Sequence, residues 1–301
     1  MYPQPPQPPR RSRRARHSFV FMLLVVATII ASGYFVARKT SAHSSHAQNT
    51  NESQELKTIA DTANAAKEAA AKATFLASTK STITNYDGAD IGVSMVDIDN
   101  NSQIDVGESA VFTAASTAKV LTAILYLHQV EQGNTSLDTT IDGTDAQTLM
   151  QKMINVSDND AWHDLNDYMG HDALQAYADS LGLTSYDATN NYITAHNDAQ
   201  LLAKLYKGQL INSAHTQLLY SFMQHTSNED LIPANLPSDA TVYHKYGELD
   251  GELHDTSIII YKGHHIALSV YTKGVDLSDY AARTTVFHDI AAAAITYMST
   301  K

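Results

Sequence analysis

Apolar residues alternate with small or polar ones along several stretches of the chain, a period that is typical of half-buried strands. In residues 89–99 the apolar positions include Ile91, Val93 and Met95, and the Asn-Asn pair that follows is suited to a hairpin turn. The expected strands are residues 89–99, 102–112, 241–247, 255–263 and 264–273. They lie at the two ends of a region whose middle follows a different period.

Between and after these strands, apolar residues recur at helical spacing. The expected helices are residues 116–132, 144–153, 158–168, 171–181, 197–207, 213–225 and 277–298. Strands at both ends of a helical middle imply one antiparallel sheet flanked by helices, with an all-helical lobe inserted between its strands. The expected fold class is therefore α/β of the α+β kind, with a cleft where the lobe meets the sheet.

The N-terminal part reads as a membrane anchor followed by a stalk. Residues 1–17 predict a disordered tail, and an uncharged apolar run over 19–36 predicts a transmembrane helix within 18–37. Five arginines precede this run against Arg38 and Lys39 after it, so the tail is expected in the cytoplasm and the rest of this single-pass protein outside the cell membrane. A cleaved signal peptide is the alternative. Residues 38–85 predict a polar spacer and an Ala-rich helix, and residues 86–301 the main domain.

Charge and composition exclude several classes of function. The formal net charge is -12. Residues 1–39 hold seven Lys/Arg and no acid, so the rest of the chain has 13 basic against 32 acidic residues and is strongly acidic. Nucleic acid is therefore not expected as a partner, because its binding draws on clustered Lys and Arg. Cysteine is absent, which rules out disulfides, thiolate nucleophiles and Cys-ligated zinc.

Ser116 and Lys119 stand three positions apart at the start of a strongly apolar helix. Positions i and i+3 share a helix face, so the two side chains can touch. Burial favours the neutral form of a lysine, which would make Lys119 a proton acceptor for the Ser116 hydroxyl. Alone, such a pair is more often a Ser N-cap followed by a lysine that reaches solvent.

Two further fragments change this weighing. Residues 157–159 read Ser-Asp-Asn at the start of an expected helix, and residues 245–247 read Lys-Tyr-Gly at the end of an expected strand. Ser116/Lys119 is the only S-x-x-K of the chain, and the other two fragments are equally unique in their patterns. With these three motifs, in this order, the sequence resembles the penicillin-recognising serine enzymes, the class A β-lactamases and D,D-peptidases. The resemblance covers roughly 86–301 and implies a β-lactamase/transpeptidase-like fold.

The resemblance implies a role for each matched position. Ser116 would be the acylated nucleophile, Lys119 its proton acceptor, and Ser157 the proton donor to the leaving nitrogen, helped by the positive field of Lys245. Substrate would be bound by Asn159, by Tyr246 and Gly247 of the third motif, and by the backbone of Glu248, whose N–H would join that of Ser116 in an oxyanion hole. Asp158 is expected only to start its helix.

Two departures from the family pattern bear on substrate and turnover. Tyr246 stands where the family has Thr or Ser, whose short hydroxyl helps to hold the substrate carboxylate, so either substrate preference is altered or the phenol points away and packs. The deacylating glutamate of class A β-lactamases is missing too, because no glutamate lies between Glu131 and Glu229. Asp187 is the nearest acid, but it reads as a solvated turn residue. Slow hydrolysis of an acyl-enzyme is the expectation.

Three functions follow for comparison. The first is a β-lactamase-like serine hydrolase acylated by β-lactams, and the second is a D,D-carboxypeptidase or endopeptidase acting on D-Ala-D-Ala stem peptides of peptidoglycan. The third is a non-catalytic envelope protein that binds the cell wall, against which the intact motifs speak. No cofactor and no metal are expected, since the histidines, among them His244 and His254 beside the third motif, lack ligand spacing and fit hydrogen-bonded structural roles.

Overall fold

The computed structural model describes the backbone of residues 47–301, with side chains from residue 54 onward, and residues 62–301 form one compact unit. The helices are α2 (Ala47–Asn85), η2 (Ala115–Ala118), α3 (Lys119–Glu131), α4 (Ala146–Asn155), α5 (Asn159–Met169), α6 (His171–Ser180), α7 (Ala195–Tyr206), α8 (Ser213–Phe222), η3 (Pro233–Asn235) and α9 (Tyr280–Thr300). The strands are β1 (Asp90–Asp97), β2 (Ser102–Gly107), β3 (Phe112–Thr113), β4 (Thr140–Ile141), β5 (Thr144–Asp145), β6 (Tyr192–Ile193), β7 (Thr241–Leu249), β8 (Glu252–Tyr261) and β9 (His264–Lys273).

The five long strands form one antiparallel sheet in the order β2-β1-β9-β8-β7. They are the five strands that the alternating pattern predicts, and the first of them pairs with the last, Met95 lying opposite Leu268. The two-residue pairs β3–β6 and β4–β5 were not predicted, because two residues are too few to show a period. β7 is an edge strand, so one side of its backbone is open to other segments.

The helices also follow the sequence pattern, with two differences. The expected helix 116–132 is divided into the tight turn η2 and α3, which puts Ser116 in a 3-10 turn before the α-helix. α2 begins at Ala47, inside the stretch that the composition marks as spacer. α3 is apolar on most sides as expected, since residues 119–127 are all buried.

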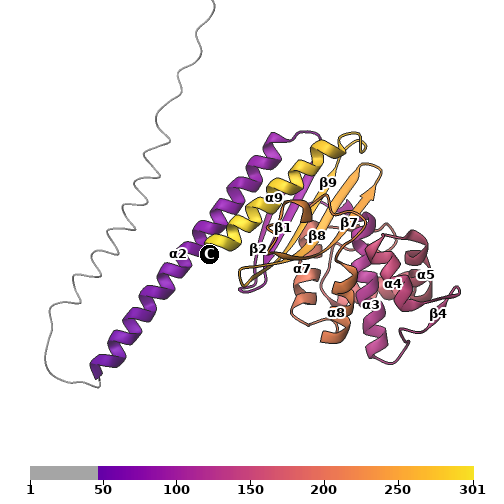
Figure 1. Cartoon of the computed structure of the whole chain (residues 1–301), viewed down its shortest axis with the longest axis horizontal. Coiled ribbons are helices and arrows are strands. Elements are labelled where there is room, and N and C mark those ends of the chain that lie inside the picture. Colours follow the sequence, from indigo (N-terminus) through magenta and orange to yellow (C-terminus); the bar gives the residue numbers. More distant parts are fainter. Residues whose placement is uncertain (1–46) are drawn as a thin grey trace, which may run out of the picture. The chain divides into compact units, whose positions relative to one another are not determined.

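One face of the sheet is covered by α9 and the second half of α2 (Figure 1). Ala71 and Phe75 of α2 join a core with the apolar residues of the strands and of α9, and the Phe75 ring meets the Tyr297 ring edge-on at 6.3 Å between centroids. The second half of α2 is thus part of the folded unit. The expected domain boundary at 86 stays a prediction of sequence composition.

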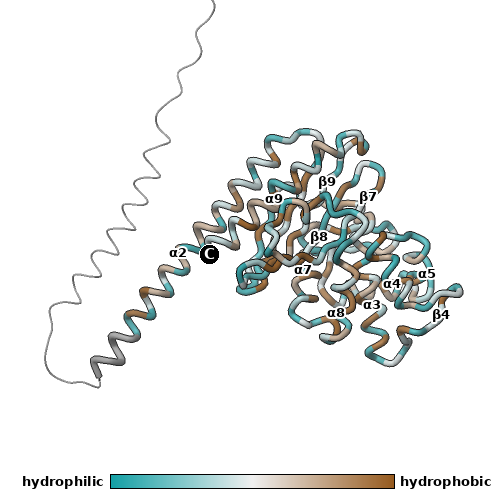
Figure 2. The backbone as a smooth tube through the Cα atoms, in the orientation of Figure 1, coloured by the Kyte–Doolittle hydropathy of each residue, from teal (hydrophilic) through white to brown (hydrophobic). Residues whose placement is uncertain are grey.

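The other face of the sheet carries α7 and the helical lobe, which forms a second core. Figure 2 shows hydrophobic stretches along these helices, with α3 in the middle of the lobe. Val96, Ile258 and Tyr271 bring the sheet into this core. A sheet with helices on both faces and a helical lobe beside its β7 edge is the predicted α+β architecture.

A buried arginine fixes the end of the sheet where β7 turns into β8. The Arg283 guanidinium, on α9, donates to the carbonyls of Gly251 and Asp276 at 2.6 and 2.8 Å and pairs with Asp279. Asp279 also accepts the Tyr86 hydroxyl. Since an unpaired buried guanidinium is costly, these contacts hold the β7–β8 turn and the loop after β9 together.

The expected tail and transmembrane segment, 1–17 and 18–37, lie outside the described residues. Within residues 47–301, no helix is both long enough and apolar enough to cross a membrane.

Truncation of Phe75 tests whether α2 belongs to the folded unit. We expect Phe75→Ala to lower the free energy of unfolding by about 3–5 kcal/mol, because a fully buried aromatic ring is lost. Leu76→Ala, at the neighbouring position that is 36% exposed, is the matched control and should cost less than about 1.5 kcal/mol. Urea denaturation measures both, and equal effects would show that α2 does not pack as described.

Candidate active site

Ser116 and Lys119 are held within one tight turn beside the end of β7. The backbone N–H of Lys119 donates to the carbonyls of Ser116 and Thr117, which closes the turn. The Lys119 side chain is fully buried, whereas Ser116 is partly exposed. Among the described residues, the Ser116 hydroxyl has no hydrogen-bond partner, so it is free to meet a ligand.

The Lys119 ammonium points at the second motif. Nζ donates to the Ser157 carbonyl and to Asn159 Oδ1, both at 2.7 Å, and lies 3.4 Å from Ser157 Oγ. Burial lowers the pKa of Lys119 to about 8, although the Asp158 carboxylate acts in the opposite direction. A lysine with such a pKa is partly neutral near physiological pH and can accept a proton.

Ser157 links the second motif to the third. Its Oγ accepts a hydrogen bond from Lys245 Nζ at 3.0 Å, so the hydroxyl lies between two ammonium groups. The backbone of Ser157 has φ +59°, a left-handed conformation that a non-glycine residue adopts only when its surroundings enforce it. Asp158 caps α5 through the Ala161 N–H at 3.0 Å, as expected of a helix-start residue.

Lys245 lies on β7, and its side chain is fully buried. Besides Ser157, Nζ donates to the carbonyl of Tyr246 at 2.9 Å. Burial, together with the nearby charge of Lys119, holds the pKa of Lys245 well below its ordinary value, and Asp255 opposes this shift. The three motifs therefore meet at the Ser157 hydroxyl, from η2/α3, from the start of α5 and from β7.

Gly247 brings the strand backbone against the turn that carries Ser116. A Cβ at Gly247 would lie 3.0 Å from the Ala114 carbonyl oxygen and 3.1 Å from the Ser116 nitrogen, closer than side chains normally approach. The His244 N–H donates to the Met223 carbonyl beyond the sheet edge, and alternate N–H groups of a strand point the same way. The Glu248 N–H is thus directed to the open edge of β7.

Tyr246 packs against the core of the sheet and also contacts Lys245. Its ring lies against the core on the α9 side of the sheet, and its hydroxyl is 2.7 Å from Ser227 Oγ. The ring centroid is nevertheless only 4.0 Å from Lys245 Nζ, a cation–π distance. The expected packing of the phenol is therefore observed, whereas an altered substrate preference stays a prediction.

A buried ionic cluster stands behind the third motif. His244 is fully buried, with Nδ1 3.0 Å from Asp255 and Nε2 3.1 Å from Glu229. Burial alone would lower the pKa of His244, but the two carboxylates raise it to about 9. The expected structural role of His244 and His254 agrees with their contacts, since His254 donates to the Thr113 carbonyl and accepts from the Thr272 N–H. The part played by Glu229 was not predicted, because it comes from a loop distant in sequence.

The loop before α7 contributes a residue that sequence reasoning missed. Asn191 has φ +54°, accepts the Ala114 N–H, and donates from its side chain to the Ala115 carbonyl at 3.0 Å. Its side-chain oxygen is buried without a hydrogen-bond partner among the described residues. Asp187, by contrast, accepts the N–H groups of Thr189 and Asn190 in a turn, as expected. The Asn-Asn dipeptide was the available signal for a left-handed residue here.

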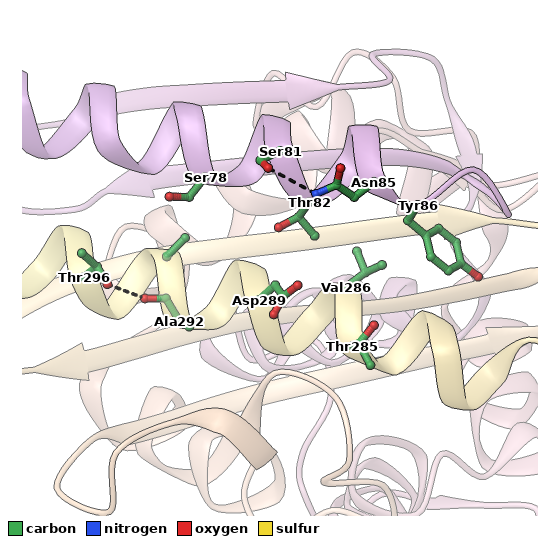
Figure 3. A pocket seen from close by; sticks show the side chains of 11 residues that line it. Ser78, Ser81, Thr82, Asn85, Tyr86, Thr285, Val286, Asp289, Ala292 and Thr296 are labelled. Carbon is green, nitrogen blue, oxygen red and sulfur yellow. Dashed lines mark hydrogen bonds between the residues drawn. The ribbon is translucent and has the colours of Figure 1, made fainter. Parts of the chain in front are cut away.

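Two grooves lie apart from the three motifs. One, of about 520 Å³, lies between α2 and α9 and is lined largely by Ser and Thr side chains (Figure 3). The other, of about 660 Å³, lies between β2 and the start of α7 and includes the Asp105–His196 pair. Neither contains a motif residue.

Residues 76–298 match the family model of the beta-lactamase enzyme family. Comparison with curated proteins gave no match.

Three solved structures share the fold. PBP-A is 18% identical with a TM-score of 0.69, covering 75% of this chain and 96% of its own. An ancestral class A β-lactamase is 24% identical with a TM-score of 0.65, covering 69% and 94%. A β-lactamase from Xanthomonas campestris pv. campestris is 22% identical with a TM-score of 0.68, covering 74% and 97%.

The charge on His244 predicts a pH-dependent stability. Because its pKa is raised from an ordinary 6.5 to about 9, the stabilisation is fully present below pH 6.5 and is lost as the pH rises through 9. Relative to His244→Gln, the wild type should lose about 3 kcal/mol of unfolding free energy between these values. Denaturant titrations at pH 6 and pH 9.5 measure this, and His196→Gln, at an exposed ion pair, should show little difference. A difference between wild type and His244→Gln that does not change with pH contradicts the assignment.

Proposed function

The chain belongs to the beta-lactamase enzyme family, and on that premise we propose that it is a serine hydrolase that forms an acyl-enzyme at Ser116 with β-lactams. The observation that carries the proposal is the Ser157 hydroxyl held at 3.0 and 3.4 Å from two buried ammonium groups, next to the turn of Ser116. Burying two like charges together costs free energy, so a purely structural role does not account for this arrangement.

Acylation would begin with proton transfer from Ser116 to Lys119. A neutral lysine keeps two N–H groups and one lone pair, and the two short contacts of Lys119 are both to oxygens that can only accept, the Ser157 carbonyl and Asn159 Oδ1. The two hydrogens are thereby used and the lone pair is left available. The Ser116 oxygen would then attack the lactam carbonyl.

The remaining groups fit the later steps of acylation. The N–H groups of Ser116 and Glu248 would stabilise the tetrahedral oxyanion, which the close approach at Gly247 supports. As the C–N bond breaks, Ser157 would donate its proton to the nitrogen and recover one from the neighbouring ammonium groups.

Deacylation would be slow. The loop from Asp187 to Ile193 approaches the Ser116 turn, but it offers carboxamides and one turn-capping carboxylate rather than a free general base. Attack of water on the ester would then lack a proton acceptor. The same reasoning supports the second candidate, a D,D-carboxypeptidase or endopeptidase acting on peptidoglycan stem peptides, and the likeness to PBP-A, a variant of which was solved as an acyl-enzyme with penicillin G, is in keeping with it.

The proposed location of the protein rests on the sequence alone. The apolar run at 19–36 and the arginines before it support a membrane-anchored protein whose catalytic domain faces the cell wall.

Intact-mass spectrometry with a penicillin tests the proposal on the purified full chain. We expect an adduct of one penicillin that persists for many minutes, with little hydrolysis of a chromogenic β-lactam, because acylation is supported and deacylation is not. Ser116→Ala should form no adduct. Ser221→Ala, at an exposed serine of α8, should behave as the wild type.

Absence of an adduct with both β-lactams and D-Ala-D-Ala esters would overturn the proposal. Rapid turnover would overturn its slow-deacylation part.

The pH dependence of acylation tests the role of Lys119. Because burial lowers the pKa of Lys119 to about 8, the rate constant of acylation should rise about tenfold per pH unit below 8 and level off above it. Lys119→Arg, whose side chain stays charged, should lose at least about 1000-fold at every pH. Stopped-flow or quenched mass measurements from pH 5.5 to 9.5 check this, and a rate independent of pH excludes Lys119 as the acceptor.

A further inference from the structure

Tyr246 places a ring beside Lys245, at the position where the family pattern has the short hydroxyl of Thr or Ser. Its own hydroxyl is engaged with Ser227 Oγ at 2.7 Å. Ser227 in turn donates its N–H to the Asn155 carbonyl at 3.0 Å. The ring is thus fastened across the free edge of β7 to the end of α4.

The ring also leaves Lys245 without a free hydrogen. Nζ donates to Ser157 Oγ and to the Tyr246 carbonyl, and its remaining side meets the Tyr246 ring at 4.0 Å from the centroid. The side chain is fully buried. Whether the amine carries three hydrogens or two, none is left to bind an anion.

The loop that holds the Tyr246 hydroxyl also carries an acidic side chain. Glu229 is partly exposed and bonded to His244, whose positive charge is already shared between two carboxylates. A ligand carboxylate placed beside Tyr246 would find no free hydrogen on Lys245 and would be repelled by Glu229.

We propose that Tyr246 is a specificity-determining residue that makes the site prefer acyl donors whose leaving group carries a neutral group, such as a carboxamide, over donors that end in a free carboxylate. This inference rests on the proposed function for the identity of the reaction. It goes beyond it by assigning the class of leaving group, and it ranks penicillin and D-Ala-D-Ala acids, whose leaving groups carry a free carboxylate, as the slower acyl donors of this site.

A matched pair of substrates tests the assignment on the full chain. The pair is an N-acylated D-Ala-D-Ala peptide and the same peptide with a C-terminal amide, and the readout is the ratio of their kcat/KM values. The wild type should favour the amide about tenfold, the factor expected for one missing charge-assisted hydrogen bond. Tyr246→Thr supplies a short hydroxyl and uncovers Lys245, so it should lower the ratio at least about tenfold. Tyr246→Phe keeps the ring and should keep the wild-type ratio.

Binding to the unreactive Ser116→Ala variant separates this inference from the proposed function. Calorimetry with both peptides should show the same preference for the amide without any chemistry. If no acyl-enzyme forms but the binding preference holds, the proposed reaction is wrong and the specificity stands. A wild type that favours the free acid, in kinetics or in binding, overturns the inference, as does an unchanged ratio in a folded Tyr246→Thr variant.

Discussion

Two lysine ammonium groups that reach the same serine hydroxyl are the constraint on which the rest of this site depends. Bringing Lys119 and Lys245 to Ser157 removes both amines from water and places like charges together. Their pKa values are therefore lowered, and oxygen acceptors surround them. The left-handed backbone of Ser157 is part of the same solution. Burial of the two lysines costs free energy, but it makes a proton acceptor available near neutral pH.

β7, the edge strand that carries Lys245, is held in place by the loop after α8. β7 has only one strand neighbour, and its outer side is joined to the loop after α8 through the His244 N–H, the His244–Glu229 ion pair and the Tyr246–Ser227 hydrogen bond. The side chains of His244 and Tyr246 thus fix the position of the strand, while Lys245 reaches the second motif and Gly247 lies against the Ser116 turn.

Sequence reasoning predicted what depends on local period and spacing, and missed what depends on tertiary contacts. The five long strands and the helical lobe follow from periodicity. The meeting of the three motifs was implied by the family resemblance that these short patterns carry, and the structure places Ser157 Oγ and Lys245 Nζ 3.0 Å apart although 88 positions separate the residues. The partner of the Tyr246 hydroxyl could not be predicted, because Ser227 lies in a loop with no period. The same holds for the 3-10 turn at Ser116 and for the buried oxygen of Asn191, which are set by packing.

The pairing of β1 with β9 has a consequence for the order in which the protein matures. Met95 cannot pair until Leu268 has been synthesised, whereas the helices of the lobe contact segments that are close in sequence. A nascent chain can therefore hold the serine residues of the first two motifs in a nearly finished lobe and still lack the strand that carries the second amine. Chemical competence is acquired late and all at once, when the C-terminal hairpin docks.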